Sequence, residues 1–397
     1  MISLSEQLLK LGSALHACQH LWQPEPFLCS ASPWRDGEPT LDSALMALTK
    51  DQVDALLKSP DQCTQWLMNC VPHYVKPLLS WEPVKNIHQR DISQPAIAAG
   101  IPGRKWQQIN YFSDLITPLS QLRSNLDWCS GKGYLATTVE HTHKIESSHC
   151  LEIDDNLCSS GRVRAQSFNL HTEFHCCDVL QPLDRDLLSL GQRHTALHAC
   201  GGLHRSMLRQ ASEVAEQIIL APCCYHLFSE DVDSRLSSAA QRLPLVFDRN
   251  TLRLPLLETV TGGARVERLR TTELTWRLAY EAWRIESTGE TRYRPLASVP
   301  KAIFNQDPAK FFHWAAQQHG LEWGTTDLEP YLNSGRERFL LSERLGIVRQ
   351  GLKRFLEHLI VLDLGCYLEE RGFGVSIKEF CPREITPRNL AIVAVKG

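Results

Sequence analysis

The sequence predicts an α/β protein whose core is a doubly wound, mainly parallel sheet. A short apolar run ends at Asp127, passes through a glycine turn and enters a helical pattern, which is typical of the first strand and helix of such a sheet. From there to about residue 222, strand-like and helix-like pieces alternate. This alternation indicates parallel strands joined by crossover helices.

Length and composition bound the class of protein. A chain of 397 residues is long for one domain and suits two or three. Hydrophobic residues make up 43% and charged residues 22%, as in soluble globular proteins. No apolar run approaches the roughly 18 to 20 residues that a membrane span needs, and the start lacks a basic-then-apolar signal pattern. We therefore expect a cytoplasmic protein with no membrane partner, and nothing in the sequence indicates an oligomeric state.

The pattern divides the chain into four regions. Leu4, Leu8, Leu11 and Leu15 recur at helical spacing, and an amphipathic run follows over residues 41–57. The regions are a helical N-terminal region (1–95), the α/β core (96–228), an insertion that is a candidate substrate-binding part (229–340), and a C-terminal helix with edge strands that complete the core (341–397).

The glycine turn predicts a cofactor cradle. The stretch reads L-D-W-C-S-G-K-G-Y-L-A, and its two glycines allow the backbone to turn sharply and approach a ligand closely. The pattern G-x-G-x-x-A also fits a dinucleotide, but the acid at Asp127 gives the spacing D-x-G-x-G-x-G of S-adenosylmethionine-dependent methyltransferases, with cysteine in place of the first glycine. The alternative is an ordinary turn without ligand. The predicted cofactor contacts here are Asp127, Cys129, Gly131 and Gly133.

Acids also follow the next two predicted strands, residues 149–153 and 173–177. Glu152 lies about twenty residues beyond the glycines, where an acid typically binds the ribose hydroxyls of an adenosine cofactor. Asp154 or Asp155 could replace it. Asp178 follows the third strand and could lie beside the adenine, or could only cap the next turn.

Titratable side chains gather after the fourth and fifth predicted strands, residues 195–200 and 217–222. These strands end in H-A-C-G-G-L-H and A-P-C-C-Y-H. Carboxyl ends of parallel strands share one edge of a sheet, so both loops should face one crevice. The residues involved are His198, Cys200, His204, Cys223, Cys224, Tyr225 and His226, of which we predict His198, Cys223, Cys224 and His226 to be catalytic.

The fourteen cysteines favour reduced thiols over a disulfide frame. Neighbours such as Cys223 and Cys224 are poor disulfide partners for each other, and no C-x-x-C pair occurs. We therefore predict no metal, although ligands from separate strands remain possible.

Charge and aromatic residues in the C-terminal part admit two interpretations. The net charge of −3 excludes a polycation that holds nucleic acid by charge alone. Ten of the eleven basic residues from Arg242 to Lys301 are arginines, which suit phosphate, but interleaved glutamates equally fit a salt-bridged surface. Trp276, Tyr280 and Trp283 repeat at helical spacing, which favours a core stripe over a base-stacking platform.

A helix over residues 342–371 and strands over 373–380 and 389–396 complete the sheet with an antiparallel pair. With these pieces the chain resembles the methyltransferase-like group, which includes the methyltransferase domain joined to a glutathione transferase-like C-terminal domain. More distantly it is similar to tRNA acceptor-stem 2'-O-methyltransferases. The motifs are D-W-C-S-G-K-G-Y-L-A, L-E-I-D, H-A-C-G-G-L-H, A-P-C-C-Y-H and T-P-R-N-L-A-I-V-A-V-K, within residues 104–226 and 345–397.

The resemblance implies a Rossmann-like class I methyltransferase fold and S-adenosyl-L-methionine as cofactor. It also implies an enzyme of the EC 2.1.1 group that acts on RNA, at a ribose oxygen or a base nitrogen. His226 or His198 would serve as base for a ribose hydroxyl. Cofactor contacts are implied at Asp127, Gly131, Gly133 and Glu152, and a substrate side at His198, Cys223, Cys224 and His226.

Other functions remain open at this stage. The methyl acceptor could be a protein or a small molecule. Cys223 or Cys224 could attack a pyrimidine covalently. The same glycine turn would serve an NAD-dependent oxidoreductase, and the same fold could bind RNA or a partner without catalysis.

Overall fold

The structure is a computed structural model that describes residues 3–85, 96–116, 122–227, 235–257, 263–324 and 327–397. The chain forms two compact units, each built from segments that lie far apart in the sequence. The first comprises residues 1–16, 77–256 and 355–397, and the second residues 17–76 and 257–354. The four regions expected from the sequence pattern stay predictions as domains.

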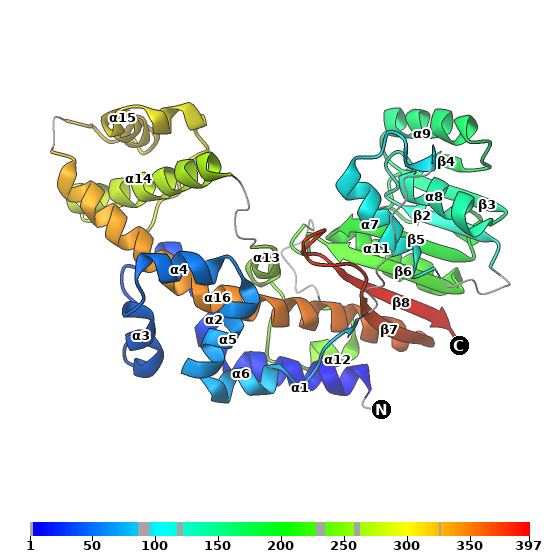
Figure 1. Ribbon diagram of the computed structural model, residues 1–397, viewed down its shortest axis with the longest axis horizontal. Helices are drawn as coiled ribbons and strands as arrows, with labels where there is room; N and C mark the ends of the chain where they lie inside the picture. The colour runs from blue at the N-terminus through cyan, green and yellow to red at the C-terminus, as the bar shows by residue number, and fades with distance from the viewer. Residues whose placement is uncertain (1–2, 86–95, 117–121, 228–234, 258–262, 325–326) are drawn as a thin grey trace. The chain divides into compact units, whose positions relative to one another are not determined.

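The described residues of the first unit form one sheet of eight strands (Figure 1). The order across the sheet is β1-β7-β8-β6-β5-β2-β3-β4. Every neighbouring pair is parallel except the two that β8 makes with β6 and β7. The strands are β1 (Val84–Lys85), β2 (Ser124–Trp128), β3 (Ser147–Glu152), β4 (Glu173–Cys176), β5 (Arg193–Cys200), β6 (Gln217–Cys223), β7 (Phe373–Glu379) and β8 (Leu390–Lys396).

This sheet confirms the predicted fold class. Each predicted strand is present, with its ends within two residues of the prediction. A mainly parallel sheet with one antiparallel strand beside its fifth parallel strand is the Rossmann-like arrangement that the resemblance implied. The register places Asp127 of β2 beside Cys150 of β3 and Thr195 of β5. The carboxyl ends of these three strands, which carry predicted site residues, therefore lie next to one another.

Crossover helices join the parallel strands. The helices that pack around the sheet are α7 (Gly103–Ser113), α8 (Tyr134–His143), α9 (Asp155–Ser167), α10 (Arg185–Ser189) and α11 (Gly202–Val214). Trp106, Ile109 and Phe112 of α7 pack in one buried cluster with Ile219 of β6 and Val393 of β8. The side chains of α7 that do not enter this cluster are therefore held at a defined place beside the sheet.

The N-terminal region is helical, as predicted. Leu8, Leu11 and Leu15 are fully buried. The run over residues 41–57, however, forms two helices, because Thr49 makes a capping box with Gln52 and starts a new helix there. These helices are α1 (Leu4–Ala17), α2 (Gln19–Trp22), α3 (Pro39–Met46), α4 (Lys50–Leu57), α5 (Pro60–Cys70) and α6 (Pro72–Leu78).

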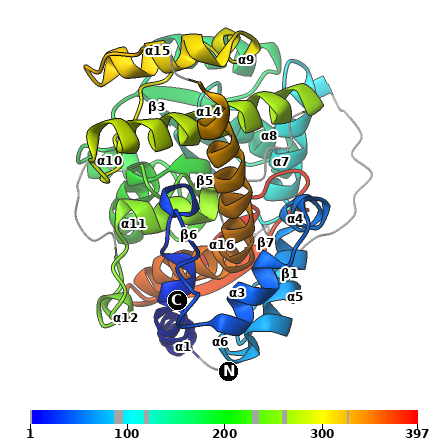
Figure 2. The same ribbon diagram turned by 90° about the vertical axis from the view of Figure 1, so that its left-hand side faces the viewer.

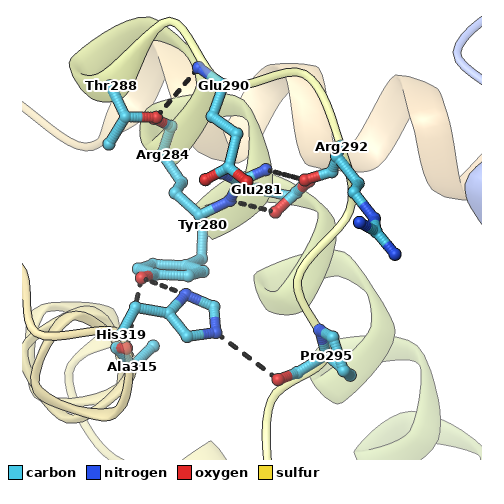
Figure 3. Close-up of polar contacts among 9 residues, drawn as sticks. All are labelled: Tyr280, Glu281, Arg284, Thr288, Glu290, Arg292, Pro295, Ala315 and His319. Carbon is cyan, nitrogen blue, oxygen red and sulfur yellow. Dashed lines mark hydrogen bonds and ion pairs between the residues drawn. The ribbon is translucent and has the colours of Figure 1, made fainter.

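The second unit has its own aromatic core around α14 (Ala264–Thr288) and α15 (Pro308–Gln318). Trp276, Tyr280 and Trp283 are at most 9% exposed, so the prediction of a core stripe is confirmed. The Tyr280 hydroxyl lies 3.1 Å from the carbonyl oxygen of Ala315 and 2.9 Å from Nδ1 of His319 (Figure 3).

One arginine of the insertion is fully buried in this unit. Arg284 forms two 2.8 Å hydrogen bonds to the carboxylate of Glu281 and one of 2.7 Å to the carbonyl oxygen of Arg292 (Figure 3). Arg277 likewise pairs with Glu273 at 3.0 Å. For these two arginines the salt-bridged interpretation holds, and neither offers its charge to a nucleic acid.

Helix α16 (Glu329–Glu369) runs without a break through 41 residues (Figure 2). It starts earlier than the predicted residue 342, because Pro330 stands in the first turn, where a helix needs no N–H donor. The remaining helices are α12 (Ser238–Gln241), α13 (Arg249–Arg253) and the short 3₁₀ turns η1 (Pro26–Leu28), η2 (Ala96–Ala98), η3 (Leu254–Leu256) and η4 (Lys301–Asn305). Among the described residues, no helix is long and apolar enough to cross a membrane.

Candidate active site

The turn after β2 has the backbone of a ligand cradle. Cys129, Gly131 and Gly133 all take positive φ angles, of 53°, 59° and 66°. A Cβ on Gly131 would meet nothing within 4 Å, whereas a Cβ on Gly133 would lie 2.5 Å from the ring of Phe174. Gly131 therefore borders open space that a ligand can enter, and Gly133 permits close packing of the turn on the sheet.

Glu152 ties this turn to the end of β3. Its Oε2 accepts a 2.8 Å hydrogen bond from the Gly131 N–H, and its Oε1 accepts hydrogen bonds from the N–H groups of Ile153 and Asp154. A carboxylate has about four lone-pair positions, so Oε2 keeps one for a further donor such as a ribose hydroxyl. The position predicted from the spacing is therefore chemically suited to that role.

The neighbouring acids have other partners. Asp154 caps α9 by accepting hydrogen bonds from the N–H groups of Asn156 and Leu157, and Asp155 lies 4.0 Å from Arg162. Asp178 accepts a 2.9 Å hydrogen bond from the Leu180 N–H and so caps the turn after β4. Glu152 is thus the acid best placed at the cradle, and contact of Asp178 with adenine stays a prediction.

Asp127 precedes the turn and is only 2% exposed. Its Oδ1 accepts a 3.1 Å hydrogen bond from the hydroxyl of Thr195 on β5. Burial raises the pKa of Asp127 to about 7, although the Thr195 hydroxyl and the Lys105 charge act in the opposite direction. Asp127 therefore links β2 to β5 next to the cradle, and its contact with the cofactor stays a prediction.

The ends of β5 and β6 bring the predicted catalytic cysteines together. Cys200 and Cys223 are register partners with their sulfurs 3.2 Å apart. Cys224 joins them, since the three sulfurs lie within 4.8 Å of one another. Cys224 itself and the nearby His198 have positive φ angles, of 44° and 69°. Such strained backbone in non-glycine residues is typical of functional sites.

His198 is held by helix α7. Its Nε2 lies 3.1 Å from Oε1 of Gln108. Burial, followed by the charges of Lys105 and Arg388, lowers the pKa of His198 to about 4. The imidazole is therefore neutral at physiological pH, is oriented by an amide and is influenced by two cations.

His226 lies in the loop after β6 and is partly exposed. Its Nδ1 is buried and has no hydrogen-bond partner among the residues that the structure describes. Burial lowers its pKa, and the positive charges of Arg253 and Arg249 add to this. A neutral, partly exposed histidine is suited to accept a proton from a substrate, and Nε2 is the ring nitrogen for this because Nδ1 is buried.

Two residues of the predicted crevice have structural contacts instead. His204 is 2% exposed, and a ring nitrogen lies 3.2 Å from the carbonyl oxygen of Ala199. Tyr225 is also 2% exposed and donates a 3.0 Å hydrogen bond to Glu357 of α16. Both support the loops that carry His198 and His226.

Three site residues were not predicted from the sequence as such. Burial lowers the pKa of Lys105, and the charge of Lys105 lowers the pKa of Asp127. Gln108 lies one helical turn further along α7 and orients His198. The charge of Arg388 contributes to the lowered pKa of His198. The spacing of Lys105 and Gln108 by three residues puts them on one helix face, which was the available signal.

A basic groove of about 920 Å³ adjoins these loops. Cys200, Gly202 and Leu227 line it, so it reaches the ends of β5 and the loop after β6. One glutamate, Glu213, also lines it. Four arginines contribute to its wall, namely Arg185, Arg205, Arg209 and Arg249.

The comparisons with known proteins agree with this geometry. Residues 104–231 match the family described as "Methyltransferase domain". A curated relative from Drosophila melanogaster, the glutathione S-transferase C-terminal domain-containing protein homolog, is 25% identical over 157 residues. That alignment covers 38% of this chain and 25% of the relative, so the chain spans about a quarter of the length of that protein.

Solved structures with similarity to part of the chain are also methyltransferases. TrmK of M. capricolum, in complex with S-adenosyl-homocysteine, has 13% identity and a TM-score of 0.25, over 28% of this chain and 50% of its own. An S-adenosylmethionine-dependent methyltransferase from Clostridium acetobutylicum has 16% identity and a TM-score of 0.24, over 32% and 53%. The glycopeptide N-methyltransferase MtfA has 15% identity and a TM-score of 0.25, over 35% and 59%.

The family match and the sheet topology together define residues 104–231 as a methyltransferase domain. S-adenosyl-L-methionine is the cofactor of this class, as the sequence predicted. The residues present fit it, because Gly131 borders space that a side chain would fill and Glu152 keeps a lone pair beside that space. The same cradle would also admit a dinucleotide, so it is the match of residues 104–231 to a methyltransferase domain that favours S-adenosyl-L-methionine over NAD.

Proposed function

We propose that this chain transfers a methyl group from S-adenosyl-L-methionine to RNA, at a ribose oxygen or a base nitrogen. The observation that carries the proposal is the basic groove beside the ends of β5 and β6. Its wall includes four arginines and one glutamate. Arginine forks bind phosphate in a bidentate manner, so this wall suits the backbone of a nucleic acid.

The cofactor, when bound, supplies an activated methyl group on a sulfonium. The chain then has to orient the acceptor and remove its proton. Glu152 and the backbone around Gly131 hold the adenosyl end, while the neutral His198 and Gln108 line the acceptor side. His226, whose side chain is partly exposed, accepts the proton of a ribose hydroxyl at Nε2, because Nδ1 is buried.

A small anionic acceptor is the second candidate. The groove volume of about 920 Å³ lies within the range of sites for small molecules, and its charge would suit a phosphorylated one. A protein acceptor would have to present acidic residues to the same arginines. All three acceptors would use the same cofactor and the same base. They differ only in which molecule the groove binds.

Transfer of labelled methyl groups tests the acceptor. The full chain is incubated with methyl-labelled S-adenosylmethionine and, separately, with total RNA, total protein and small metabolites. We expect label in RNA that ribonuclease releases. Arg209→Glu and Arg249→Glu should raise the KM for RNA by about tenfold each, as loss of a charged contact of ~1.4 kcal/mol implies.

The matched control is Arg123→Glu. Arg123 is an exposed arginine at the opposite end of the sheet, beside the first residue of β2, and pairs with Glu146 at 2.6 Å. This variant should leave the KM unchanged, and all three variants should bind S-adenosylmethionine like the parent. Label that appears only in protein or small metabolites would overturn the RNA proposal and would keep the methyltransferase.

A further inference from the structure

Three cysteine thiols lie together beside the predicted active site, and the mechanism proposed above assigns no chemical step to any of them. The Sγ atoms of Cys200, Cys223 and Cys224 lie within 4.8 Å of one another, and the closest pair, Cys200 and Cys223, is 3.2 Å apart. Cys223 is 6% exposed, while Cys200 and Cys224 are partly exposed. The cluster is therefore mostly sheltered but can be reached from solvent.

A backbone irregularity in β5 creates the first half of this cluster. Leu197 pairs with Ala221, but Ala199 pairs with Pro222, so the register shifts at His198. In a regular strand, Cys200 and Leu197 would point to opposite faces, because they are three residues apart. The extra residue at His198 places Cys200 on the same face of the sheet as Leu197. Cys200 therefore becomes the register partner of Cys223.

A second irregularity brings in the third thiol. Consecutive residues of a strand point to opposite faces, so Cys223 and Cys224 should diverge. Cys224 instead takes a left-handed conformation with φ of 44°, and its sulfur stays beside that of Cys223. Two strained positions, His198 and Cys224, thus both act to gather sulfur atoms. Such backbone strain persists where the surrounding structure fixes it, and it is frequent at functional sites.

The geometry suits a thiophilic ion. Zinc binds thiolates at about 2.3 Å in a tetrahedron, which places ligand sulfurs ~3.8 Å apart. The Cys200 and Cys223 sulfurs, 3.2 Å apart, are slightly closer than this, and no pair in the cluster is more than 4.8 Å apart, so small shifts of the side chains suffice to surround an ion. Three thiolates fill three of the four positions that zinc prefers, so one position remains for water or another ligand.

We propose that Cys200, Cys223 and Cys224 bind a Zn²⁺ ion at the carboxyl ends of β5 and β6. The ion would join the two strand ends and hold the loop that carries His226. Binding releases the thiol protons and involves no oxidation. The proposal does not depend on the methyl acceptor, and it would stand if the acceptor were a protein.

Cobalt substitution tests the site in the full chain, reduced and freed of metal. Co²⁺ titration should give a thiolate-to-cobalt charge-transfer band and intense tetrahedral d–d bands, which saturate at one ion per chain and disappear on addition of Zn²⁺. Cys224→Ser and Cys200→Ser should lose intensity in that band. They should also weaken Zn²⁺ binding by more than the roughly 100-fold that loss of an outer-shell partner can cost.

Two controls make the result specific. Cys176→Ser removes an exposed cysteine outside the cluster and should leave the spectrum unchanged. His149, Glu173 and His175 also lie close enough to hold an ion, but their nitrogen and oxygen ligands give no thiolate band. His175→Gln should therefore not affect the charge-transfer signal.

A measurement on the unmodified chain covers variants that fail to fold. Zn²⁺ should slow alkylation of Cys200, Cys223 and Cys224, read peptide by peptide in a mass spectrometer, and should not slow alkylation of Cys176. Equal alkylation rates with and without Zn²⁺ would overturn the proposal. So would isolation of the chain with a Cys200–Cys223 disulfide that persists under the reducing conditions in which the metal is offered.

Discussion

The carboxylate of Glu152 accepts a hydrogen bond from the backbone N–H of Gly131 at 2.8 Å, across 21 residues of sequence. This contact joins the end of β3 to the turn after β2, and it orients the cradle before any ligand arrives. The same carboxylate is the acid expected to bind the ribose. Its loss should therefore affect cofactor affinity in two ways, by removing a partner and by releasing the turn.

Glu152→Gln should weaken S-adenosylmethionine by about 10- to 100-fold, since a hydrogen bond to a charged group contributes about 1.5 to 3 kcal/mol. Isothermal titration calorimetry measures this Kd. Asp154→Ala is the matched control, because Asp154 caps α9 and its loss should cost about 1 kcal/mol of stability without affecting the Kd. Equal affinities for the parent and Glu152→Gln would contradict the assignment.

The two glycines of the cradle should behave differently. Gly131→Ala strains only the backbone, at φ of 59°, and should reduce the free energy of unfolding by about 1 kcal/mol. Gly133→Ala adds a clash with Phe174 and should cost about 1 to 3 kcal/mol more. Urea unfolding compares them. Phe174→Leu should partly rescue Gly133→Ala and not Gly131→Ala, and identical losses in both alanine variants would refute this packing.

Asp127→Asn should change the pH dependence of stability. Burial raises the folded-state pKa from 3.8 to about 7. Between these values the unfolded chain ionises while the folded chain keeps its proton, so the parent loses stability as pH rises from about 4 to about 7. A difference of three pKa units corresponds to a loss of about 4 kcal/mol in the free energy of unfolding over this pH range. Asp127→Asn has no carboxyl to ionise at this position and should not show this loss.

The measurement is the free energy of unfolding of both proteins across this range. Thr195→Val gives a second test, because the Thr195 hydroxyl lowers the pKa of Asp127. Without it the folded pKa should rise further, and the loss of stability should extend to higher pH. A constant difference between the parent and Asp127→Asn at all pH values would show that the carboxyl is not perturbed.

The rate of methyl transfer should report which histidine is the base. A base must be neutral, and burial lowers the pKa of His226 below the ordinary value of 6.5. The rate constant kcat/KM should therefore rise with pH through a value below 6.5 and then stay level. His226→Gln should lower kcat by about 10² to 10⁴ for a ribose acceptor, with the Kd for cofactor unchanged. If kcat/KM instead rose with pH through a pKa near 4, and only His198→Gln removed that rise, the base would be His198.

Arg284 offers a test of the second unit. Arg284→Met leaves Glu281, only 3% exposed, without its bidentate partner and should destabilise this unit by about 3 to 5 kcal/mol. The double variant Glu281→Leu/Arg284→Met should recover most of that loss, because both charges are then absent. Thermal unfolding of the single and double variants measures this. Equal losses would indicate that the ion pair is not the cause.

Local sequence patterns were sufficient for the fold class and for the strands of the sheet, and they account for one half of the candidate site, whose residues stay predictions. Alternating strands and helices, the glycine spacing and the acid twenty residues later all follow from short-range rules, and Glu152 lies where they predict. Burial of Trp276, Tyr280 and Trp283 was predicted from helical spacing in the same way.

The other half depends on geometry that no local pattern contains. A register shift at His198 decides which face Cys200 occupies, and strand alternation alone gives the wrong face. Lys105 and Gln108 reach the site because the apolar face of α7 packs on β6 and β8, which are more than a hundred residues later in the chain. Such long-range packing sets the surroundings of His198, and hence its pKa.

The place of β8 has a consequence for synthesis. This strand, residues 390–396, is the last strand of the sheet to leave the ribosome, yet it lies between β6 and β7 rather than at the edge. Until it arrives, the nascent chain presents β6 with an unpaired edge while more than 150 residues are still being translated. Exposed strand edges recruit other strands. A stop codon or frameshift shortly before residue 390 should therefore cause aggregation and degradation, even though it leaves every residue of the cofactor cradle intact.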